Sequence, residues 1–301
     1  MKEDRHAPGI DRTRATLRVT GGACLISFSA VFVPLAGTDP TVSAFYRMLI
    51  GGIVLAVLTR MKGERLLQGW RPLIMLTVGG FALALDLALW HRCILFVGPG
   101  LATLLANFQV FFVAAVGLLV FRERLTWKVA VAIPLAVAGL YLIVGLRWGA
   151  FSGDYRLGVA LGLMAAFCYT VYILFLRMAQ QSGSTFATIT LATLFTGLFL
   201  GLFAAGNGES FAVPGVRSWL VLGAYALVSQ VLGWLLITSG IGRIEASRVG
   251  LALLLQPTLA FVWDVLFFSR PTTLVEVAGA LLAMGAIYLG TVGRSAPARV
   301  R

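Results

Sequence analysis

The sequence predicts an all-α membrane protein in which ten transmembrane helices form two inverted five-helix repeats around a central cavity. Three observations predict this fold. Apolar residues make up 59% of the 301 residues and charged residues only 12%, which is about half the charged share of a soluble domain. Apolar runs long enough to cross a hydrocarbon core of about 30 Å follow one another along most of the chain. The third observation is a pattern of residues that occurs once in each half.

The repeated pattern is visible in the stretches 98–126 and 245–273. Each stretch holds an apolar run with an amide side chain inside it and a charged residue at its end. Gln256 takes the place of Gln109, and Arg270 takes the place of Glu123. A shorter match, between residues 139–142 and 287–289, follows later in each half.

A further repeated block pairs residues 82–90 with residues 226–234 at a constant spacing, with the correspondences Ala82-Leu83 to Ala226-Leu227, Asp86 to Gln230, and Trp90 to Trp234. These matches relate the first five expected helices to the last five. Because five is an odd number, the second set must enter the membrane in the opposite orientation.

The expected helices lie between short breaks that contain polar residues, glycine or proline. The apolar run at 19–35 follows a basic segment but is long for a signal peptide, and we interpret it as a helix that is retained. No break is long enough to contain a soluble domain. The expected helices span about residues 19–36, 42–59, 72–92, 99–121, 128–146, 157–177, 185–205, 217–238, 246–268 and 273–292.

This division predicts four parts of the chain: a polar, disordered tail (1–18), a first five-helix repeat (19–146), a second repeat (157–292) and a short basic tail (293–301). Of the 24 Lys and Arg residues, 18 lie in the tails and in the breaks on the same side as the tails, and five lie in the other breaks. The positive-inside rule therefore predicts that both tails are cytoplasmic. The net charge of +12 forms no compact patch, so nucleic acid is not an expected partner.

Residues suited to enzymatic chemistry are sparse in this sequence. His6 and His91 cannot build a zinc site or a buried catalytic triad with the spacings present. Cys24, Cys93 and Cys168 are odd in number and lack CxxC spacing, so they are expected to be core residues. No glycine-rich loop has phosphate-binding spacing. We therefore expect no enzyme activity, no metal and no cofactor, and any solute movement must be driven by a gradient or by exchange.

Polar side chains in a bilayer cost free energy unless they face protein or a water-filled cavity. Asp86 and Trp90 are four residues apart and share a helix face, and Gln230 and Trp234 repeat this arrangement. The tryptophans could be interfacial residues and the polar residues could bind neighbouring helices. Because the arrangement occurs twice, we favour the interpretation that both pairs line a central cavity.

Three more amides have positions that suggest a role. Thr103 and Asn107 share one helix face, and we expect Asn107 to line the cavity. Gln109 points about 200° away from Asn107 and is expected to bind a neighbouring helix. Gln256 precedes Pro257, which frees the carbonyl of residue 253 from its helical hydrogen bond. That proline either only kinks the helix or places Gln256 at a binding site.

Arg47 lies about five residues inside the expected helix 42–59, where an unpaired arginine costs free energy. It either extends toward the interface, or pairs with Asp86 or Asp264, or binds a substrate carboxylate. Asp264 and Glu276 flank Arg270 near the outer helix ends, and we expect them to form a solvated cluster.

Aromatic and small residues complete the candidate walls. Tyr169, Tyr172 and Trp263 offer flat faces with polar tips, which suit an amphipathic solute that carries a ring. An ammonium group could also lie over such a ring. The pairs Gly158/Gly162 and Gly197/Gly201 are expected to let helices approach closely.

Three segments carry a resemblance to a known family: Ala44–Met48 (AFYRM), Asn107–Phe112 (NFQVFF) and Phe121–Thr126 (FRERLT). Over about residues 17–293 the chain resembles the EamA-type exporters of the drug/metabolite transporter superfamily, and segment 107–112 is most similar to the aromatic amino-acid exporters. The resemblance implies a proton-driven or facilitative carrier in the bacterial inner membrane. The sequence departs from the family pattern at Gln256 and Arg270, where the resemblance would imply acidic residues.

The expected function is secondary transport, by alternating access, of aromatic or large hydrophobic amino acids and similar amphipathic metabolites out of the cell. The alternative is efflux of cationic drugs or other small metabolites. A third hypothesis, an intramembrane enzyme acting on lipid, needs a clustered acid or base pair, and only Asp86 is a clear deep candidate. The expected partners are the solute and the lipid bilayer. A monomer is compatible with this design, and the sequence leaves the oligomeric state open.

Overall fold

All of the regular structure in the described residues is helical. The structure is a computed structural model, and it describes residues 8–66, 69–119, 126–144, 149, 152–180, 184–241 and 252–292. This confirms the predicted all-α class for that part of the chain. The elements are α1 (Pro8–Ser27), α2 (Ser29–Leu35), α3 (Pro40–Met61), α4 (Trp70–Val97), α5 (Pro99–Ala106), α6 (Gln109–Leu119), α7 (Trp127–Val144), α8 (Gly153–Gln180), α9 (Thr185–Gly206), α10 (Val216–Ala224), the π-helix η2 (Tyr225–Gly233), α11 (Trp234–Ile241), α13 (Leu255–Phe268) and α14 (Leu274–Val292).

Seven helical segments in the described residues are long and apolar enough to cross a membrane: Thr13–Leu35, Pro40–Met61, Trp70–Val97, Pro99–Leu119, Gly153–Gln180, Phe186–Gly206 and Val216–Gly240. Three further apolar helices are shorter, at Trp127–Ile143, Leu255–Phe268 and Leu274–Gly290. These lengths fit a multi-pass membrane protein, while the number of ten transmembrane helices stays a prediction.

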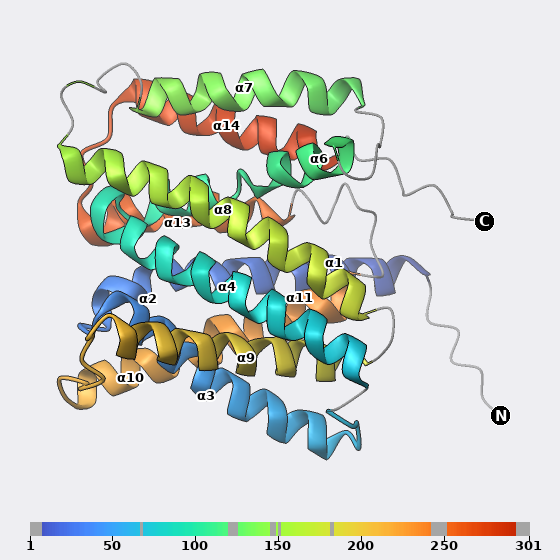
Figure 1. The fold of residues 1–301 in the computed structure, drawn as a ribbon. Coiled ribbons are helices and arrows are strands. Elements are labelled where there is room, and N and C mark those ends of the chain that lie inside the picture. The colour runs from blue at the N-terminus through green and yellow to red at the C-terminus, as the bar shows by residue number, and fades with distance from the viewer. Residues whose placement is uncertain are drawn as a thin grey trace.

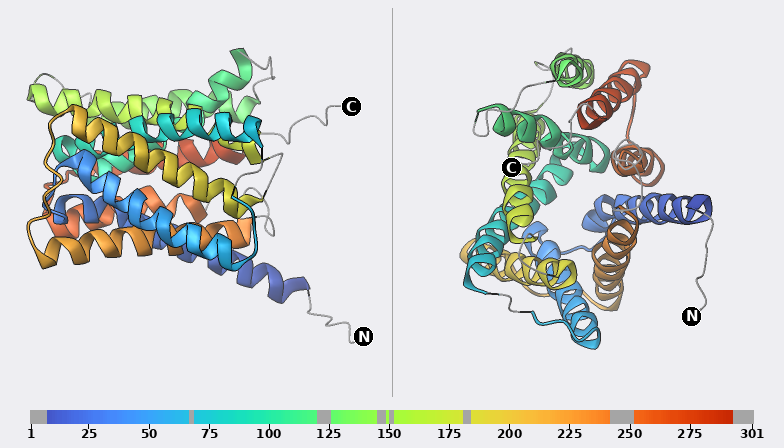
Figure 2. Two further views of the ribbon diagram at one scale, coloured as in Figure 1. Left: turned by 60° about the horizontal axis from the view of Figure 1, so that its bottom comes forward. Right: turned by 90° about the vertical axis from the view of Figure 1, so that its right-hand side faces the viewer.

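The helices lie side by side and run between two ends of one bundle (Figure 1). The first turn of α1 and the last turn of α14 lie at the same end, on the right in Figure 1, which we call the terminal end. The opposite end holds the connections at 36–39, 207–215 and 269–273, and we call it the distal end. Seen along the helices, α7 and α14 form one edge of the bundle, and α3 and α9 lie at the opposite edge (Figure 2).

Helices from the two halves of the sequence interleave. The contacting pairs are α4 with α8, α3 with α9, α1 with α11, α5 with α13, and α7 with α14. Each of these pairs takes one helix from before residue 146 and one from after residue 152. The interior of the bundle is therefore built from both halves together.

The two predicted glycine pairs lie at close helix contacts. A Cβ atom on Gly162 of α8 would lie 2.9 Å from the sulfur of Cys93 on α4, and one on Gly158 would lie 2.6 Å from Cβ of Phe96. On α9, a Cβ atom on Gly201 would lie 3.0 Å from the ring of Phe45. Only glycine permits such close approach without displacing a neighbour. The predicted packing role is confirmed.

Two helices that the sequence predicts as continuous are broken. α1 and α2 are separated at Phe28, and α5 and α6 are separated at Asn107 and Phe108. The Asn107 amide donates from Nδ2 to the Thr103 carbonyl at 2.8 Å. Ser27 donates from Oγ to the Cys24 carbonyl at 2.6 Å. Such side-chain bonds to the preceding turn compete with the helical ladder and bend it.

The N-terminal expectation is wrong for residues 8–18, which the sequence predicts as disordered. α1 begins at Pro8, and its residues Ala15 and Val19 are buried. A Cβ atom on Gly240 of α11 would lie 2.6 Å from the carbonyl oxygen of Ala15. Close packing on α11 thus orders a segment whose composition is polar.

The expected helix 246–268 includes residues 246–251, which lie outside the described part of the chain. Within the described part, a turn at Leu254 precedes α13. Pro257 lies in the first turn of α13, where its missing N–H leaves the carbonyl of residue 253 without its helical donor. The interruption expected from this proline is therefore present.

Candidate functional site

A hydrogen-bonded polar cluster lies inside the bundle around Arg47 of α3, which is 6% exposed. Arg47 donates from Nε to Oε1 of Gln230 at 3.1 Å and from Nη1 to the Tyr225 hydroxyl at 2.9 Å. Its guanidinium carbon lies 4.7 Å from the centre of the Tyr225 ring. Both partners belong to η2, which therefore fixes the charge in place. Arg47 neither extends to the interface nor pairs with Asp264.

The Tyr225 hydroxyl continues this network to His91 of α4, with 3.2 Å between the oxygen and Nε2. Nδ1 of His91 lies 2.7 Å from the Leu87 carbonyl oxygen, which can only accept. Nδ1 is therefore assigned as the protonated nitrogen, and Nε2 accepts from the tyrosine. The Tyr225 oxygen in turn accepts from Arg47. His91 and Tyr225 are fully buried.

Gln230 continues the network in a second direction. Its Nε2 donates to Oγ1 of Thr193 on α9 at 3.2 Å, and Thr193 donates to the Ile189 carbonyl at 2.8 Å. We call Arg47, His91, Thr193, Tyr225 and Gln230 the Arg47 cluster. Its members come from α3, α4, α9 and η2, and all are buried.

The π-helical turn explains how Tyr225 and Gln230 reach the same guanidinium. The two residues are five positions apart, which an α-helix separates by about 140° around its axis. A π-helix bonds residue i to residue i+5 and so brings residues five apart onto one face. Gly51 of α3 supplies the space, because a Cβ atom there would lie 2.7 Å from Cγ of Gln230.

Asp86 lies beside this cluster but is not bonded to it. Its side chain is 6% exposed and interacts electrostatically with the Arg47 guanidinium. The charged atoms of the two residues do not come within 4.0 Å of each other, so the predicted Asp86–Arg47 ion pair is not formed. Within the described residues, Asp86 has no hydrogen-bond donor.

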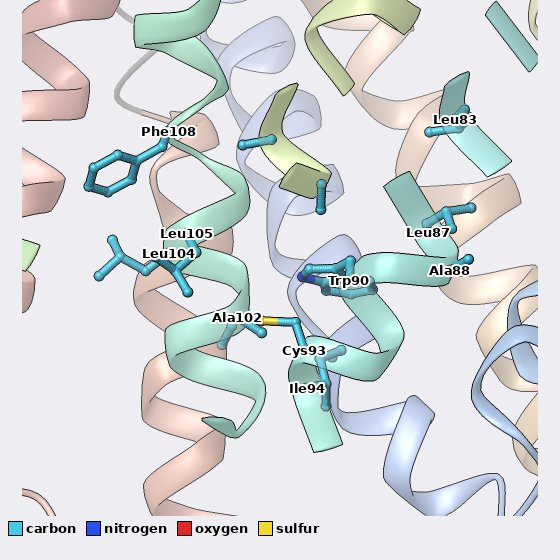
Figure 3. Close-up of a cluster of buried hydrophobic side chains, with 14 of the residues drawn as sticks. Leu83, Leu87, Ala88, Trp90, Cys93, Ile94, Ala102, Leu104, Leu105 and Phe108 are labelled. Atoms are coloured by element: carbon cyan, nitrogen blue, oxygen red, sulfur yellow. The ribbon is translucent and has the colours of Figure 1, made fainter. Parts of the chain in front are cut away.

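Aromatic residues of α4 and α8 adjoin Asp86. The rings of Tyr169 and Tyr172 lie 5.5 Å apart, and both hydroxyls interact electrostatically with Asp86. Trp90 is 8% exposed, and its Nε1 is buried without a hydrogen-bond acceptor among the described residues. Figure 3 shows its ring extending from α4 toward α5, with the nitrogen at the end that faces α5.

The other predicted residues lie in different surroundings. Trp234 is half-buried in a crevice lined by Leu55, Phe186 and Ile189. Trp263 donates from Nε1 to Ser27 Oγ at 3.0 Å and stacks on Phe28, which joins α13 to the break between α1 and α2. Thr103 and Asn107 bond to carbonyls of their own helix. Gln256 is half-buried in the first turn of α13.

Gln109 only partly fits its expected role as a contact between helices. Its carbonyl oxygen accepts from Thr170 of α8 at 3.4 Å. The side-chain oxygen is buried without a donor in the described part of the chain. The contact with the neighbouring helix thus uses the backbone of Gln109 rather than the amide that suggested it.

The expectation that Asp264 belongs to a solvated cluster at the distal end is wrong, because Asp264 is only 2% exposed. Its Oδ2 accepts from the backbone N–H of Gly100 at 3.0 Å and from Nη1 of Arg270 at 3.2 Å. A carboxylate at the N-terminus of α5 is stabilised by the unpaired N–H groups there. Glu276 instead accepts from the backbone N–H and hydroxyl of Thr273 at the start of α14.

A second ion pair lies at the distal end. Arg92 of α4 donates to Glu209 at 2.6 Å. The same carboxylate accepts from the hydroxyl of Thr41 at 2.6 Å and from its backbone N–H at 3.1 Å. These bonds hold the connection after α9 against the ends of α3 and α4.

Sequence reasoning missed His91, Thr193 and Tyr225. Tyr225 directly precedes the repeated block 226–234, which was the available signal. His91 follows Trp90 and faces η2 instead of a metal. No group of three or more His, Cys, Asp or Glu side chains in the described residues could hold a metal ion.

Comparison with known proteins identifies the family. The model of the EamA-like transporter family matches the chain in two segments, residues 16–145 and 156–292. The chain belongs to the EamA-like transporter family. As an EamA-like transporter it is a multi-pass membrane protein that moves solutes, not an enzyme.

Several curated relatives share part or most of this EamA-like chain. It is similar to the "Probable amino-acid metabolite efflux pump" of Salmonella typhimurium, with 27% identity over 64% of this chain and 68% of that protein. The uncharacterized transporter YdfC of Bacillus subtilis is 25% identical over 87% of this chain and 85% of its own length. The threonine/homoserine exporter RhtA of Escherichia coli is 28% identical over 56% of this chain, which spans about half of RhtA.

The fold also resembles that of a solved crystal structure. The two chains superpose with a TM-score of 0.67 over 93% of this chain and 97% of the other, at 20% sequence identity. This likeness concerns the fold of the EamA-like chain.

Proposed function

We propose that this EamA-like transporter exports aromatic or large hydrophobic amino acids, and similar amphipathic metabolites, by alternating access. The observation that carries the proposal is a group formed by Arg47, Asp86 and Tyr172, which are buried, and by Tyr169, which is partly buried beside Tyr172. It combines both signs of charge with aromatic rings inside an apolar bundle. Polar and ionisable groups at such depth are costly and mark solute pathways in membrane proteins.

The proposal includes two inverted five-helix repeats and ten membrane passes. The pairing of helices supports it. If each helix is replaced by its counterpart in the other half, the pair α1–α11 becomes the pair α8–α4, which is also in contact. The pairs α3–α9, α5–α13 and α7–α14 each join a helix to its own counterpart, so they are unchanged by the exchange. The interruptions at Asn107 and at Leu254 also occupy equivalent places when Gln109 is matched with Gln256. Interrupted helices at corresponding positions are typical of binding sites in transporters with inverted repeats.

We also propose that the protein lies in the bacterial inner membrane with both termini in the cytoplasm. Described basic residues support this orientation. The ends of α3 and α8 and the starts of α4 and α7 lie at the terminal end (Figure 1), and these helix ends or their adjoining residues carry Arg60, Lys62, Arg65, Arg71, Lys128 and Arg177. Fewer described basic residues, Arg92, Arg156, Arg217 and Arg270, lie near the opposite helix ends. Asp39, Asp154, Glu209 and Glu276 lie at helix starts or connections of the distal end, whereas Glu64 follows α3 at the terminal end. Cytoplasmic ends carry the excess of Lys and Arg.

The substrate class rests on the aromatic rings and on the relatives. Tyr169 and Tyr172 offer stacking faces next to Asp86. Two relatives are named for export of amino acids or their metabolites. The further residues that we propose for the cavity are Trp90, Thr103, Asn107, Gln230, Trp234, Gln256 and Trp263.

The test is counterflow of labelled phenylalanine and tryptophan into liposomes that contain the purified protein. Flux well above that of empty liposomes supports the proposal. Flux of another solute without flux of either aromatic amino acid would remove this substrate class.

A second candidate function is efflux of cationic drugs, and the carboxylate of Asp86 favours it because it has no bound counter-charge. Quaternary ammonium compounds that compete for the labelled solute, while amino acids do not, would select this function over the first.

A further inference from the structure

We propose that Asp86 and Arg47 bind the head group of a zwitterionic α-amino acid, with the ammonium group on Asp86 and the carboxylate on Arg47. The inference rests on the proposed function and adds to it the chemistry that recognises the solute. It concerns the charged head group alone and is independent of the side chain that the solute carries.

The first half of the site is the Asp86 carboxylate. It is nine-tenths buried, and within the described residues nothing donates a hydrogen bond to it or forms an ion pair with it. A buried carboxylate in this condition costs several kcal/mol or more relative to one that is paired. A ligand ammonium group, with three donors, would supply both the charge and the hydrogen bonds that are missing.

The second half is the remaining edge of the Arg47 guanidinium. A guanidinium carries five N–H donors. Gln230 takes one from Nε and Tyr225 takes one from Nη1, whereas Nη2 makes no hydrogen bond to a described residue. These two bonds and the Tyr225 ring hold the group rigid, which lowers the entropic cost of binding a carboxylate.

The relation between the two charges selects a zwitterion. Asp86 and Arg47 interact electrostatically but do not approach within 4.0 Å, so neither satisfies the other. A cation or an anion alone would add net charge to a site inside an apolar bundle, which is costly. A zwitterion satisfies both groups and leaves the net charge of the site unchanged. The unpaired Nε1 donor of Trp90, one turn from Asp86, lies on the same side of α4.

The experiment measures competition for phenylalanine counterflow by phenethylamine, which lacks the carboxylate, and by 3-phenylpropionate, which lacks the ammonium group. For the native protein, we expect the half-inhibition concentration of each analogue to be at least about tenfold higher than that of unlabelled phenylalanine. Each analogue lacks one charged hydrogen-bonding group, and the loss of one charged hydrogen bond weakens binding by about this factor. In Asp86→Asn, the half-inhibition concentration of phenylalanine should rise by about tenfold or more, while that of 3-phenylpropionate should not rise. In Arg47→Lys, the half-inhibition concentration of phenylalanine should rise, while that of phenethylamine, which has no carboxylate, should stay unchanged.

Asp86→Glu keeps the charge and should restore part of the preference for phenylalanine over 3-phenylpropionate. If Asp86→Asn lost its preference only because it failed to fold, restoring the charge would not be expected to recover this selectivity. Asp154→Asn, an exposed position at the start of α8, is the matched control and should behave as the native protein does. The inference is overturned if Asp86→Asn transports phenylalanine with an unchanged ratio of the two half-inhibition concentrations. It is also overturned if phenethylamine competes as well as phenylalanine with the native protein.

Labelled threonine separates the two proposals. If threonine moves and phenylalanine does not, the aromatic substrate class is wrong. The head-group test then proceeds with 1-amino-2-propanol and 3-hydroxybutyrate as the single-charge analogues of threonine. If the native protein moves phenylalanine, but the ratio of the half-inhibition concentrations does not change in the Asp86 and Arg47 variants, the substrate class stands and the head-group assignment fails.

Discussion

Arg47 and Gln230 are joined by a buried hydrogen bond of 3.1 Å, although 183 residues separate them in the sequence. They belong to the two different segments that match the EamA-like family model. The bond therefore ties one half of the transporter to the other at a buried charge inside the bundle. This contact and its neighbours lead to specific expectations for variants.

Gln230→Leu should lower the free energy of unfolding by about 1–3 kcal/mol, because Nε of the buried Arg47 loses its acceptor. Thr193 loses its donor at the same time. The measurement is the midpoint of denaturation in detergent, together with the rate of counterflow. Gln180→Leu, at an exposed position on α8, should change the midpoint little. Equal effects of the two variants would contradict the importance of the cluster.

Tyr225→Phe keeps the ring over Arg47 but removes the hydroxyl that joins Arg47 to His91. We expect the free energy of unfolding to fall by about 1–3 kcal/mol. Because the two residues share one network, Tyr225→Phe and His91→Leu together should cost less than the sum of the separate losses, by about 0.5–3 kcal/mol. Tyr141→Phe, exposed on α7, serves as the control. Simple additivity would mean that the two side chains act independently.

Gly51→Ala should displace Gln230, because the new Cβ atom would lie 2.7 Å from Cγ of that residue. We expect lower stability and slower transport, although alanine is otherwise favoured over glycine in a helix by about 1 kcal/mol. Gly223→Ala is the matched control, since a Cβ atom there meets no atom within 4 Å. Gly223→Ala should leave stability unchanged or raise it. A Gly51→Ala protein as stable as the Gly223→Ala protein would show that α3 and η2 can separate at no cost.

Asp264→Asn should destabilise the protein by about 3–5 kcal/mol, because it leaves Arg270 without its buried counter-charge and weakens the anchor of α5. Thermal unfolding in detergent measures the effect. Asp154→Asn is again a suitable control, since Asp154 is exposed. If Asp264→Asn unfolds at the native temperature, the ion pair at the distal end does not stabilise the fold.

The proposed orientation predicts which positions react from outside the cell. In a protein without its native cysteines, single cysteines at Ala7 and Ala298 should resist an impermeant thiol reagent in intact cells and react in inverted membrane vesicles. A cysteine at Ala212, exposed at the distal end, should show the opposite pattern. Labelling of Ala7 and Ala298 from opposite sides would exclude two inverted repeats of five helices each.

The sequence was a good guide where one-dimensional patterns carry the physics. Long apolar runs predicted the helices, because a backbone in hydrocarbon must satisfy its own hydrogen bonds. The spacing of Gly158 and Gly162 predicted a close helix contact, and Pro257 predicted an interruption. Arg47 stood out as a costly charge, and Gln230 stood out through the repeat. The sequence was a poor guide to Asp264, whose burial depends on Gly100 and Arg270 meeting in space.

The sequence by itself determined that this chain is a helical membrane protein, and it restricted the candidate site to a few polar residues in apolar runs. Only the tertiary structure decided which of these residues meet. The π-helical turn at η2 brings Tyr225 and Gln230 onto one face, and the contact of α3 with η2 delivers Arg47 to both. A regular α-helical period would have directed Tyr225 and Gln230 to different sides. The partner of a buried charge depends on how helices cross and turn, and that information lies in contacts between distant residues rather than in local spacing.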